Sequence, residues 1–284
     1  MIINKKIENL NAIHLLITNI LVPLLLIKME QIYYKITNKT ECHNGFQYVD
    51  GLNILDKPFE RDGSNVAGGL YFTTAKYIFN FLYRGCYLRE ITLPKDCQWV
   101  RDWSWNKFRA DKIILGKKYD LADPFTFQLL LERGADVHAS GDRALIWASK
   151  NGYGEIVKLL VDAGANIYAD GNCALWWASK HGNLEIVKYL VKSGAHIGNC
   201  YIIDYLNDGI LENNPEIFKY FVENITDIYK INDCVLKYAL EYGHLKVVEY
   251  LNNLKNDVNN LKNDVNNLKN DVNNLKNDVK NNNK

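Results

Sequence analysis

Few residues in this chain stand at the spacings that catalytic or metal chemistry requires. Cys42 and His43 could begin a metal site, but no further ligand follows them at the spacing of a metal-binding motif. The chain contains neither a G-x-x-x-x-G-K-[ST] phosphate loop nor an H-E-x-x-H zinc motif. Its six cysteines are scattered without a C-x-x-C pair, which indicates reduced thiols. The sequence therefore predicts no catalytic residues, no metal site and no cofactor.

Length and charge describe a globular chain without a dedicated nucleic-acid surface. The 284 residues are enough for one large domain or two ordinary ones. Lys and Arg number 34 and Asp and Glu number 33, so the net charge is +1. A nucleic-acid binder needs a clustered excess of Lys and Arg. We therefore expect no nucleic-acid partner.

An apolar segment lies near the N-terminus, at residues 10–27. A membrane-spanning helix needs roughly 20 predominantly apolar residues, and this run is interrupted by polar residues and by Pro23. It also lacks the small residues of a signal-peptide cleavage site. Residues 1–28 are predicted to be an apolar leader. The alternatives are a non-native extension before a true start at Met29, a membrane anchor, which is disfavoured, or a helix packed on the next domain.

The C-terminal segment, residues 252–284, repeats the unit LKNDVNN every seven residues. Valine at the a position with leucine at d favours parallel two-stranded coiled coils. In a parallel pair, Asp264 at g would face Lys269 at e of the partner, whereas an antiparallel pair would bring like charges together. The abundant asparagines oppose helix formation. The alternatives are a parallel homodimer through residues 247–279 and a single frayed helix. The seam consists of Val258, Leu261, Val265, Leu268, Val272, Leu275 and Val279.

The middle of the chain repeats with a period of 30 residues. The segment ASGDRALIWASKNGYGEIVKLLVDAGANIY (139–168) aligns with ADGNCALWWASKHGNLEIVKYLVKSGAHIG (169–198). Each unit predicts a short helix such as 144–151, a glycine turn, and a second helix with a broad apolar face. Neither helix can bury its apolar side alone, so the units are expected to stack as a solenoid. Trp147 and Trp177 share one repeat position and are predicted to be core residues.

These units resemble ankyrin repeats through A-L-x-x-A-S-K-x-G, x-x-E-I-V-K-x-L-V and G-A-x-I. The family's Thr-Pro-Leu-His reads R-A-L-I and C-A-L-W here, so the hydrogen bonds that Thr and His supply between repeats are expected to be missing. Each unit is three residues shorter than the usual 33, which predicts a stunted β-hairpin finger. The resemblance covers residues 121–251, divided into a partial unit at about 121–138 and units at 139–168, 169–198, 199–229 and 230–251.

The first and last repeat units carry distinct boundary signals. Asp123 and Pro124 are typical of the first residues of a helix, which places a helix in the partial unit. Asn252 and Asn253 stand where the other units carry glycine. We therefore expect the final repeat helix to continue into the heptad segment without a break.

Residues 29–120 predict a small α+β domain. GGLYFT (68–73) and CYLREITLP (86–94) are expected strands, Thr74–Arg84 is an expected helix, and 107–121 suggests a further strand and a connector. This block resembles the leader domain of many ankyrin proteins of giant, mimivirus-type DNA viruses. The expected fold class is therefore mainly α, an ankyrin-repeat solenoid preceded by a small α+β domain and followed by a coiled-coil helix.

The resemblance implies a non-enzymatic protein–protein interaction module, viral in origin. It would act in the cytoplasm of an infected host cell on an unidentified host or viral protein. Binding is expected on the concave face of the repeats, and an ordinary solvated surface is the alternative for each position. The candidate residues are Asp142, Lys150, Asn151, Asn172, Lys180 and His181.

An enzymatic alternative concerns the N-terminal domain. His43-Asn44-Gly45 and Gly69-Leu70-Tyr71-Phe72 are similar to the His-Gly and Gly-x-Tyr-Phe elements of ADP-ribosyltransferases. The resemblance implies that a His and a Tyr hold the nicotinamide ribose and that a Glu polarises it, and Glu90 is the nearby candidate. The context of Glu90 departs from that motif. The other interpretation is that His43 caps a turn and that Tyr71 and Tyr77 are core aromatics.

Overall fold

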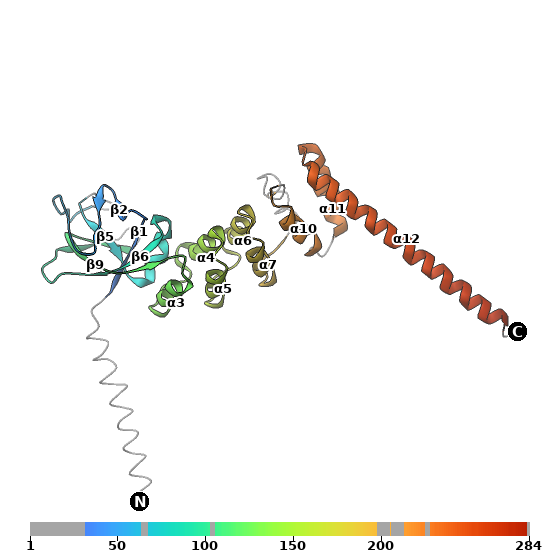
Figure 1. Ribbon diagram of the computed structural model, residues 1–284, viewed down its shortest axis with the longest axis horizontal. Coiled ribbons are helices and arrows are strands. Elements are labelled where there is room, and N and C mark those ends of the chain that lie inside the picture. Colours follow the sequence, from blue (N-terminus) through green and yellow to red (C-terminus); the bar gives the residue numbers. More distant parts are fainter. Residues whose placement is uncertain are drawn as a thin grey trace, which may run out of the picture. The chain divides into compact units, whose positions relative to one another are not determined.

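The computed structural model describes residues 32–63, 68–102, 106–197, 205, 213–224 and 228–282 (Figure 1). The predicted leader, with its apolar segment 10–27, lies outside the described residues, as does much of the third repeat unit. The chain forms two compact units. The first runs to Ala144 and includes Lys158–Ala165, and the second comprises Leu145–Val157 and the chain from Asn166 onward.

The first unit is built on a seven-stranded antiparallel sheet with the order β4-β9-β6-β1-β5-β8-β7. A two-stranded ribbon pairs β2 (Cys42–His43) with β3 (Phe46–Gln47). Residues such as Tyr33, Phe72 and Ile113 form a buried apolar cluster on the sheet. The strands of the sheet are β1 (Tyr33–Thr37), β4 (Gly51–Ile54), β5 (Leu70–Thr73), β6 (Tyr87–Thr92), β7 (Trp99–Asp102), β8 (Lys107–Ala110) and β9 (Lys112–Asp120).

Strands β8 and β9 show that the sheet curls back on itself. One residue, Asp111, separates them in sequence, although three strands lie between them in the sheet. The Asp111 amide donates to the Gln98 carbonyl beside β7 at 3.0 Å, and the Asp111 carbonyl accepts from the Leu55 amide after β4 at 2.7 Å. The two edges therefore meet at this residue. The segment expected to hold one strand at 107–121 holds two, and the expected α+β domain is sheet-rich.

The helix expected at 74–84 is a 3₁₀ helix, η2 (Ala75–Arg84). Its buried Ala75 and Ile78 are three residues apart, as are Phe79 and Leu82, which is the spacing at which 3₁₀ side chains align. The helix ends at Gly85, where an added Cβ would lie 2.0 Å from the carbonyl oxygen of Thr37 in β1. Only glycine allows η2 to end this close to the strand.

The remaining described elements are helices. Helix α3 begins as predicted, because the Asp123 carboxylate accepts from the Phe125 amide at 3.0 Å and Pro124 is its first residue. Gly152 and Gly182, with φ of 78° and 73°, separate the two helices of successive repeats. The helices are α3 (Pro124–Glu132), α4 (Ala139–Asn151), α5 (Gly154–Asp162), α6 (Ala169–Lys180), α7 (Leu184–Lys192), α10 (Pro215–Asn224), α11 (Ile228–Tyr242) and α12 (Leu245–Asn282).

A left-handed turn stands at the start of α4 and of α6, where a β-hairpin finger would lie. The φ angles are 53°, 68° and 56° at residues 140–142, and 51°, 68° and 62° at residues 170–172. Glycine adopts this conformation readily, and Asp and Asn tolerate it better than other residues with a side chain. Because this compact turn stands in place of a hairpin, the prediction of a stunted finger is confirmed.

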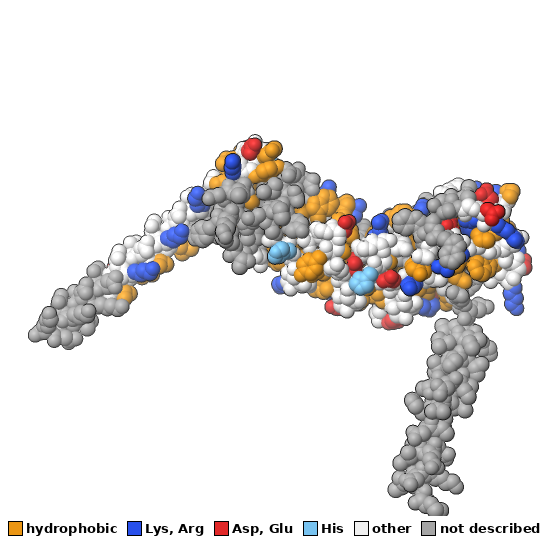
Figure 2. Space-filling view, turned by 180° about the vertical axis from the view of Figure 1, so that it is seen from behind, with side chains coloured by type: hydrophobic (Ala, Val, Ile, Leu, Met, Phe, Trp, Pro, Cys, Tyr) orange, Lys and Arg blue, Asp and Glu red, His pale blue; other side chains and the backbone are white. Residues whose placement is uncertain are grey.

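Helix α12 runs from Leu245 to Asn282 without interruption, which confirms that the last repeat helix continues into the heptad segment (Figure 1). Val247 and Leu251 are buried at its start. Farther along, Leu261 and Leu268 are 63% and 64% exposed, and apolar side chains are visible along the helix in Figure 2. Among the described residues, no helix is both long enough and apolar enough to span a membrane.

Candidate protein-interaction surface

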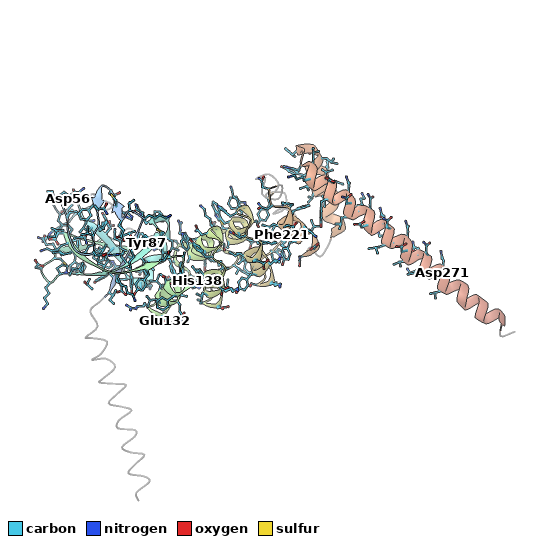
Figure 3. The ribbon with its side chains drawn as sticks, in the orientation of Figure 1. Asp56, Tyr87, Glu132, His138, Phe221 and Asp271 are labelled. Carbon is cyan, nitrogen blue, oxygen red and sulfur yellow. The ribbon has the colours of Figure 1, made fainter. Side chains whose placement is uncertain are left out.

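Two of the six predicted binding residues are buried. Asp142 and Asn172 are only 5% and 4% exposed. Both lie in the left-handed turns, and Asp142 Oδ1 is 3.0 Å from Nδ1 of His138, which is labelled in Figure 3. Short polar side chains in such turns serve the local backbone and its neighbours. The expectation that these two side chains face solvent is therefore wrong.

The exposed ends of α4 and α6 carry the other predicted residues. The Asn151 amide donates to the Trp147 carbonyl at 2.7 Å. At the equivalent position 30 residues later, His181 Nδ1 lies 3.1 Å from the Trp177 carbonyl oxygen. Both side chains thus satisfy a carbonyl that the last helical turn leaves open. Asn151 and His181 stabilise the helix ends and remain exposed to solvent.

Lysine and tryptophan side chains lie together beside these helix ends. Lys150 Nζ is 4.2 Å from the centroid of the Trp177 ring in the next repeat. Lys180 Nζ is 4.4 Å from the Trp176 centroid, and the two indole rings meet edge to face at 4.7 Å. A cation over an exposed tryptophan face contributes about 0.5–1 kcal/mol. We call Lys150, Trp176, Trp177 and Lys180 the Trp–Lys cluster.

The tryptophans differ from their predicted place in the core. Trp147 and Trp177 are both partly exposed, and the Trp147 ring lies 5.2 Å from that of Tyr153. Each tryptophan is followed by a lysine three residues later, at Lys150 and Lys180. Residues three apart are neighbours on a helix surface. That spacing is the sequence signal that could have placed these rings beside solvated lysines.

An asparagine links adjacent repeats where the Thr and His of the ankyrin motif are missing. The Asn183 amide, at the start of α7, donates to the Ser149 carbonyl of α4 at 2.9 Å. The same side chain packs beside Gly152, where an added Cβ would lie 3.0 Å from Asn183 Oδ1. This contact fixes the spacing of the helix ends that carry the Trp–Lys cluster.

The residues of the enzymatic alternative do not converge on one place. His43 and Tyr71 line the same cavity, but Glu90 does not. Glu90 accepts a hydrogen bond from the Tyr119 hydroxyl at 2.9 Å and lies 3.9 Å from Arg133 at the end of α3. Burial and this hydrogen bond raise the pKa of Tyr119 to about 12, so it remains a donor at neutral pH. Glu90 therefore joins the sheet to α3.

Cysteine and metal chemistry find few sites in the structure. In the described part of the chain, no group of three or more His, Cys, Asp or Glu side chains could hold a metal ion. Cys42, Cys86, Cys97 and Cys173 are free thiols. Burial raises the pKa of the Cys97 and Cys173 thiols, which lowers their reactivity at neutral pH.

Comparison with known proteins agrees with the helical repeats. Residues 120–199 match the family described as ankyrin repeats (3 copies). R868 of Acanthamoeba polyphaga mimivirus, named as an ankyrin repeat protein, is 48% identical over 134 residues, or 45% of this chain and 66% of that protein. R869 of the same virus, named as uncharacterized, is 45% identical over 134 residues, or 45% of this chain and 95% of that protein. The chain belongs to the mimivirus ankyrin-repeat family.

The family relationship covers only part of several relatives. R229, also a mimivirus protein named for ankyrin repeats, is 38% identical over 143 residues, which are 45% of this chain and 47% of R229. The match thus spans slightly less than two thirds of R868 and about half of R229. What this mimivirus ankyrin-repeat protein shares with them is a module for protein–protein interaction.

Proposed function

We propose that this protein binds a host or viral protein in the cytoplasm of the infected cell, without catalysis, through the Trp–Lys cluster and the adjoining Asn151 and His181. The observation that carries the proposal is the pairing of Lys150 and Lys180 with indole rings that are partly exposed. Tryptophan is enriched among residues that dominate binding energy. The lysines favour a partner segment that places a carboxylate beside an apolar side chain.

Burial along the second helices supports the further proposal that residues 121–251 stack as a solenoid between a 29–120 domain and a 252–284 coiled coil. Equivalent apolar positions in α5 and α7 are each at most 5% exposed. A stack buries these positions and leaves the helix ends in one row. The row would repeat the lysine and tryptophan positions on the face predicted to be concave. The buried positions are Ile156, Val157, Leu160, Ile186, Val187 and Leu190.

We also propose that α12 pairs in parallel with α12 of a second copy. Leu261 and Leu268 stand exposed on one stripe of the helix, and a free stripe of this kind is typical of a coiled-coil seam. Asp264 at g and Lys269 at e give complementary charges only in the parallel arrangement. Two copies joined in this way would bind a bivalent target more tightly without any new contact.

The binding surface is tested by pull-down of the full chain from infected-cell lysate, read by mass spectrometry. The test variant carries Lys150→Glu and Lys180→Glu, which reverse the charge of the cluster. The control carries Lys192→Glu and Lys219→Glu, the same charge change at exposed positions of α7 and α10. We expect one set of proteins to be retained by the natural chain and by the control, and lost by the test variant.

Folding of both variants is checked by far-ultraviolet circular dichroism before the comparison. If a folded test variant retains the same proteins in the same amounts as the natural chain, the Trp–Lys cluster is not the binding surface. If the control loses them as well, binding depends on overall charge and the proposed surface is again wrong.

A further inference from the structure

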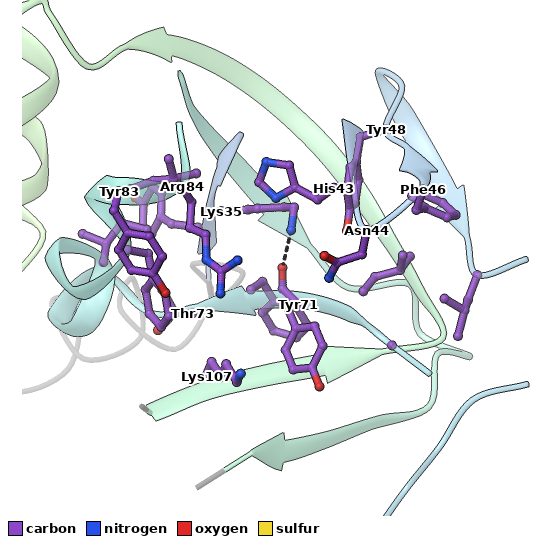
Figure 4. Close-up of a pocket in the computed structure, with 18 of the residues that line it drawn as sticks. Lys35, His43, Asn44, Phe46, Tyr48, Tyr71, Thr73, Tyr83, Arg84 and Lys107 are labelled. Carbon is purple, nitrogen blue, oxygen red and sulfur yellow. Dashed lines mark hydrogen bonds between the residues drawn. The ribbon is translucent and has the colours of Figure 1, made fainter. Parts of the chain in front are cut away.

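The first unit holds a cavity whose charged lining is entirely basic (Figure 4). Its volume is about 380 Å³, within the roughly 300–1,000 Å³ of small-molecule sites. The residues that line it come from β1, β5, η2, β8 and the β2–β3 ribbon. None of the described residues that line it is acidic. Its basic side chains are Lys35, Lys57, Arg84 and Lys107.

Three of these cations lie against tyrosine rings. A cation over a ring face is stabilised by the negative potential of that face, which leaves its N–H groups available to another acceptor. Lys107 also lies 3.7 Å from the Asp102 carboxylate. The distances from cation to ring centroid are 4.4 Å for Lys35 over Tyr48, 4.4 Å for Lys107 over Tyr71 and 4.8 Å for Arg84 over Tyr83.

Lys35 is the clearest sign that an anion belongs here. It is only 7% exposed, and its Nζ donates to the Tyr71 carbonyl oxygen at 3.0 Å, as drawn in Figure 4. In the described part of the chain, no carboxylate lies within ion-pair distance of this Nζ. Burial, and then the nearby Arg84, lower the pKa of Lys35 to about 7. A buried ammonium without an opposite charge is costly, and a bound anion would remove that cost.

The other side of the cavity is neutral and polar. His43 Nε2 accepts from the Asn38 amide at 3.2 Å, and burial lowers its pKa to about 4, so its ring is uncharged. In Figure 4 the Asn44 amide points toward the same space as Lys35 and Tyr71. An amide offers one donor and one acceptor side by side, which matches the hydrogen-bonding edge of a nucleobase.

We propose that this cavity binds a small phosphorylated ligand with a planar base, of the mononucleotide class. Lys35, Arg84 and Lys107 hold the phosphate, because several converging cations suit a doubly charged group better than a carboxylate. The base lies between the Tyr71 ring and the Asn44 amide. This site is separate from the Trp–Lys cluster, so either proposal can fail without the other.

The test is isothermal titration calorimetry of the full chain at pH 6.5, where Lys35 is mostly protonated. The probes are AMP, inorganic phosphate and phosphotyrosine. The variants are Lys35→Met, which keeps the space filled, and Arg84→Gln, which changes an exposed residue and preserves the fold. Lys95→Met, at an exposed turn outside the cavity, is the control. We expect saturable AMP binding that weakens at least tenfold in both variants and is unchanged in the control.

A second readout follows proton uptake. At pH 8 Lys35 is mostly neutral, so AMP binding should take up a proton in the natural chain and none in Lys35→Met. Absence of saturable AMP binding, or equal affinity in the natural chain and both variants, would overturn the proposal. Tighter binding of phosphotyrosine, or equal affinity for inorganic phosphate, would overturn the assignment of a nucleobase.

Discussion

Lys150 of one repeat lies with its Nζ 4.2 Å from the ring centroid of Trp177 in the next repeat. The contact crosses the repeat boundary on the exposed side, whereas the Asn183 to Ser149 hydrogen bond crosses it between helix ends. The binding surface and the repeat spacing thus depend on neighbouring contacts. A change that alters the spacing of the repeats should also alter the Trp–Lys cluster.

A double-mutant cycle measures the first of these contacts. Lys150→Met and Trp177→Leu should show a coupling of about 0.5–1 kcal/mol in urea unfolding followed by circular dichroism, because each change removes the same cation–ring attraction. Lys192→Met combined with Trp177→Leu is the control and should show none. Coupling of equal size in both cycles would contradict a direct contact.

Gly152→Ala tests the second contact. Gly152 has φ of 78° and an added Cβ would lie 3.0 Å from Asn183 Oδ1, while Gly134 has φ of 82° and open space around it. Both alanine variants should lose about 1 kcal/mol from the left-handed backbone. Gly152→Ala should lose about 1 kcal/mol more, because it also disturbs the Asn183 hydrogen bond. Adding Asn183→Ala should remove the difference, and equal losses at the two glycines would show that the contact does not matter.

Local signals in the sequence found much of the helical part. The glycines that recur every 30 residues mark the turns after the first helix of each repeat, since a left-handed turn strongly favours glycine. Asp123 and Pro124 marked the start of α3 for an equally local reason. Continuity of α12 followed from the absence of glycine at Asn252 and Asn253. Each of these features depends on residues close in sequence.

Features set by distant contacts could not be predicted in this way. A tryptophan on an apolar helix face looks the same whether it enters the core or lies under a lysine of the next repeat, as Trp177 does. Asp142 reads as a surface residue until its left-handed backbone is known. The basic cavity brings Lys35 and Lys107 together from strands 70 residues apart, and no local pattern records that pairing.

Arg109→Lys should destabilise the sheet domain. The Arg109 guanidinium is 1% exposed and donates to three backbone carbonyls of one loop, at 2.9 Å to Glu60, 3.0 Å to Asp62 and 2.9 Å to Gly63. A lysine ammonium cannot reproduce this planar fork. We expect a loss of about 2–3 kcal/mol in urea unfolding. Arg101→Lys, at an exposed position of β7, is the control, and a similar loss there would show that the loop contacts are not responsible.

Stability should rise with pH because of Lys35. Burial, and then Arg84, hold its pKa near 7 in the folded chain, against an ordinary value of 10.5. Between these values the unfolded chain binds the extra proton, so the free energy of unfolding gains up to about 1.4 kcal/mol per pH unit from this residue. Below pH 7 the full cost of burying the charge is present. Unfolding of the natural chain and of Lys35→Met from pH 6 to 10 should differ by this slope, and parallel curves would contradict it.

Leu268→Asp tests the pairing of α12. Leu268 lies in the exposed seam, whereas Asn267 is one position before it, outside the seam, and Asn267→Asp introduces the same charge. Sedimentation equilibrium should show a dimer for the natural chain and for Asn267→Asp, and a monomer for Leu268→Asp. Helicity should fall with the dimer, because a single asparagine-rich helix is marginal in water. If all three chains are monomers, or if all three are dimers, the seam does not pair, and the exposed leucines of α12 have another role.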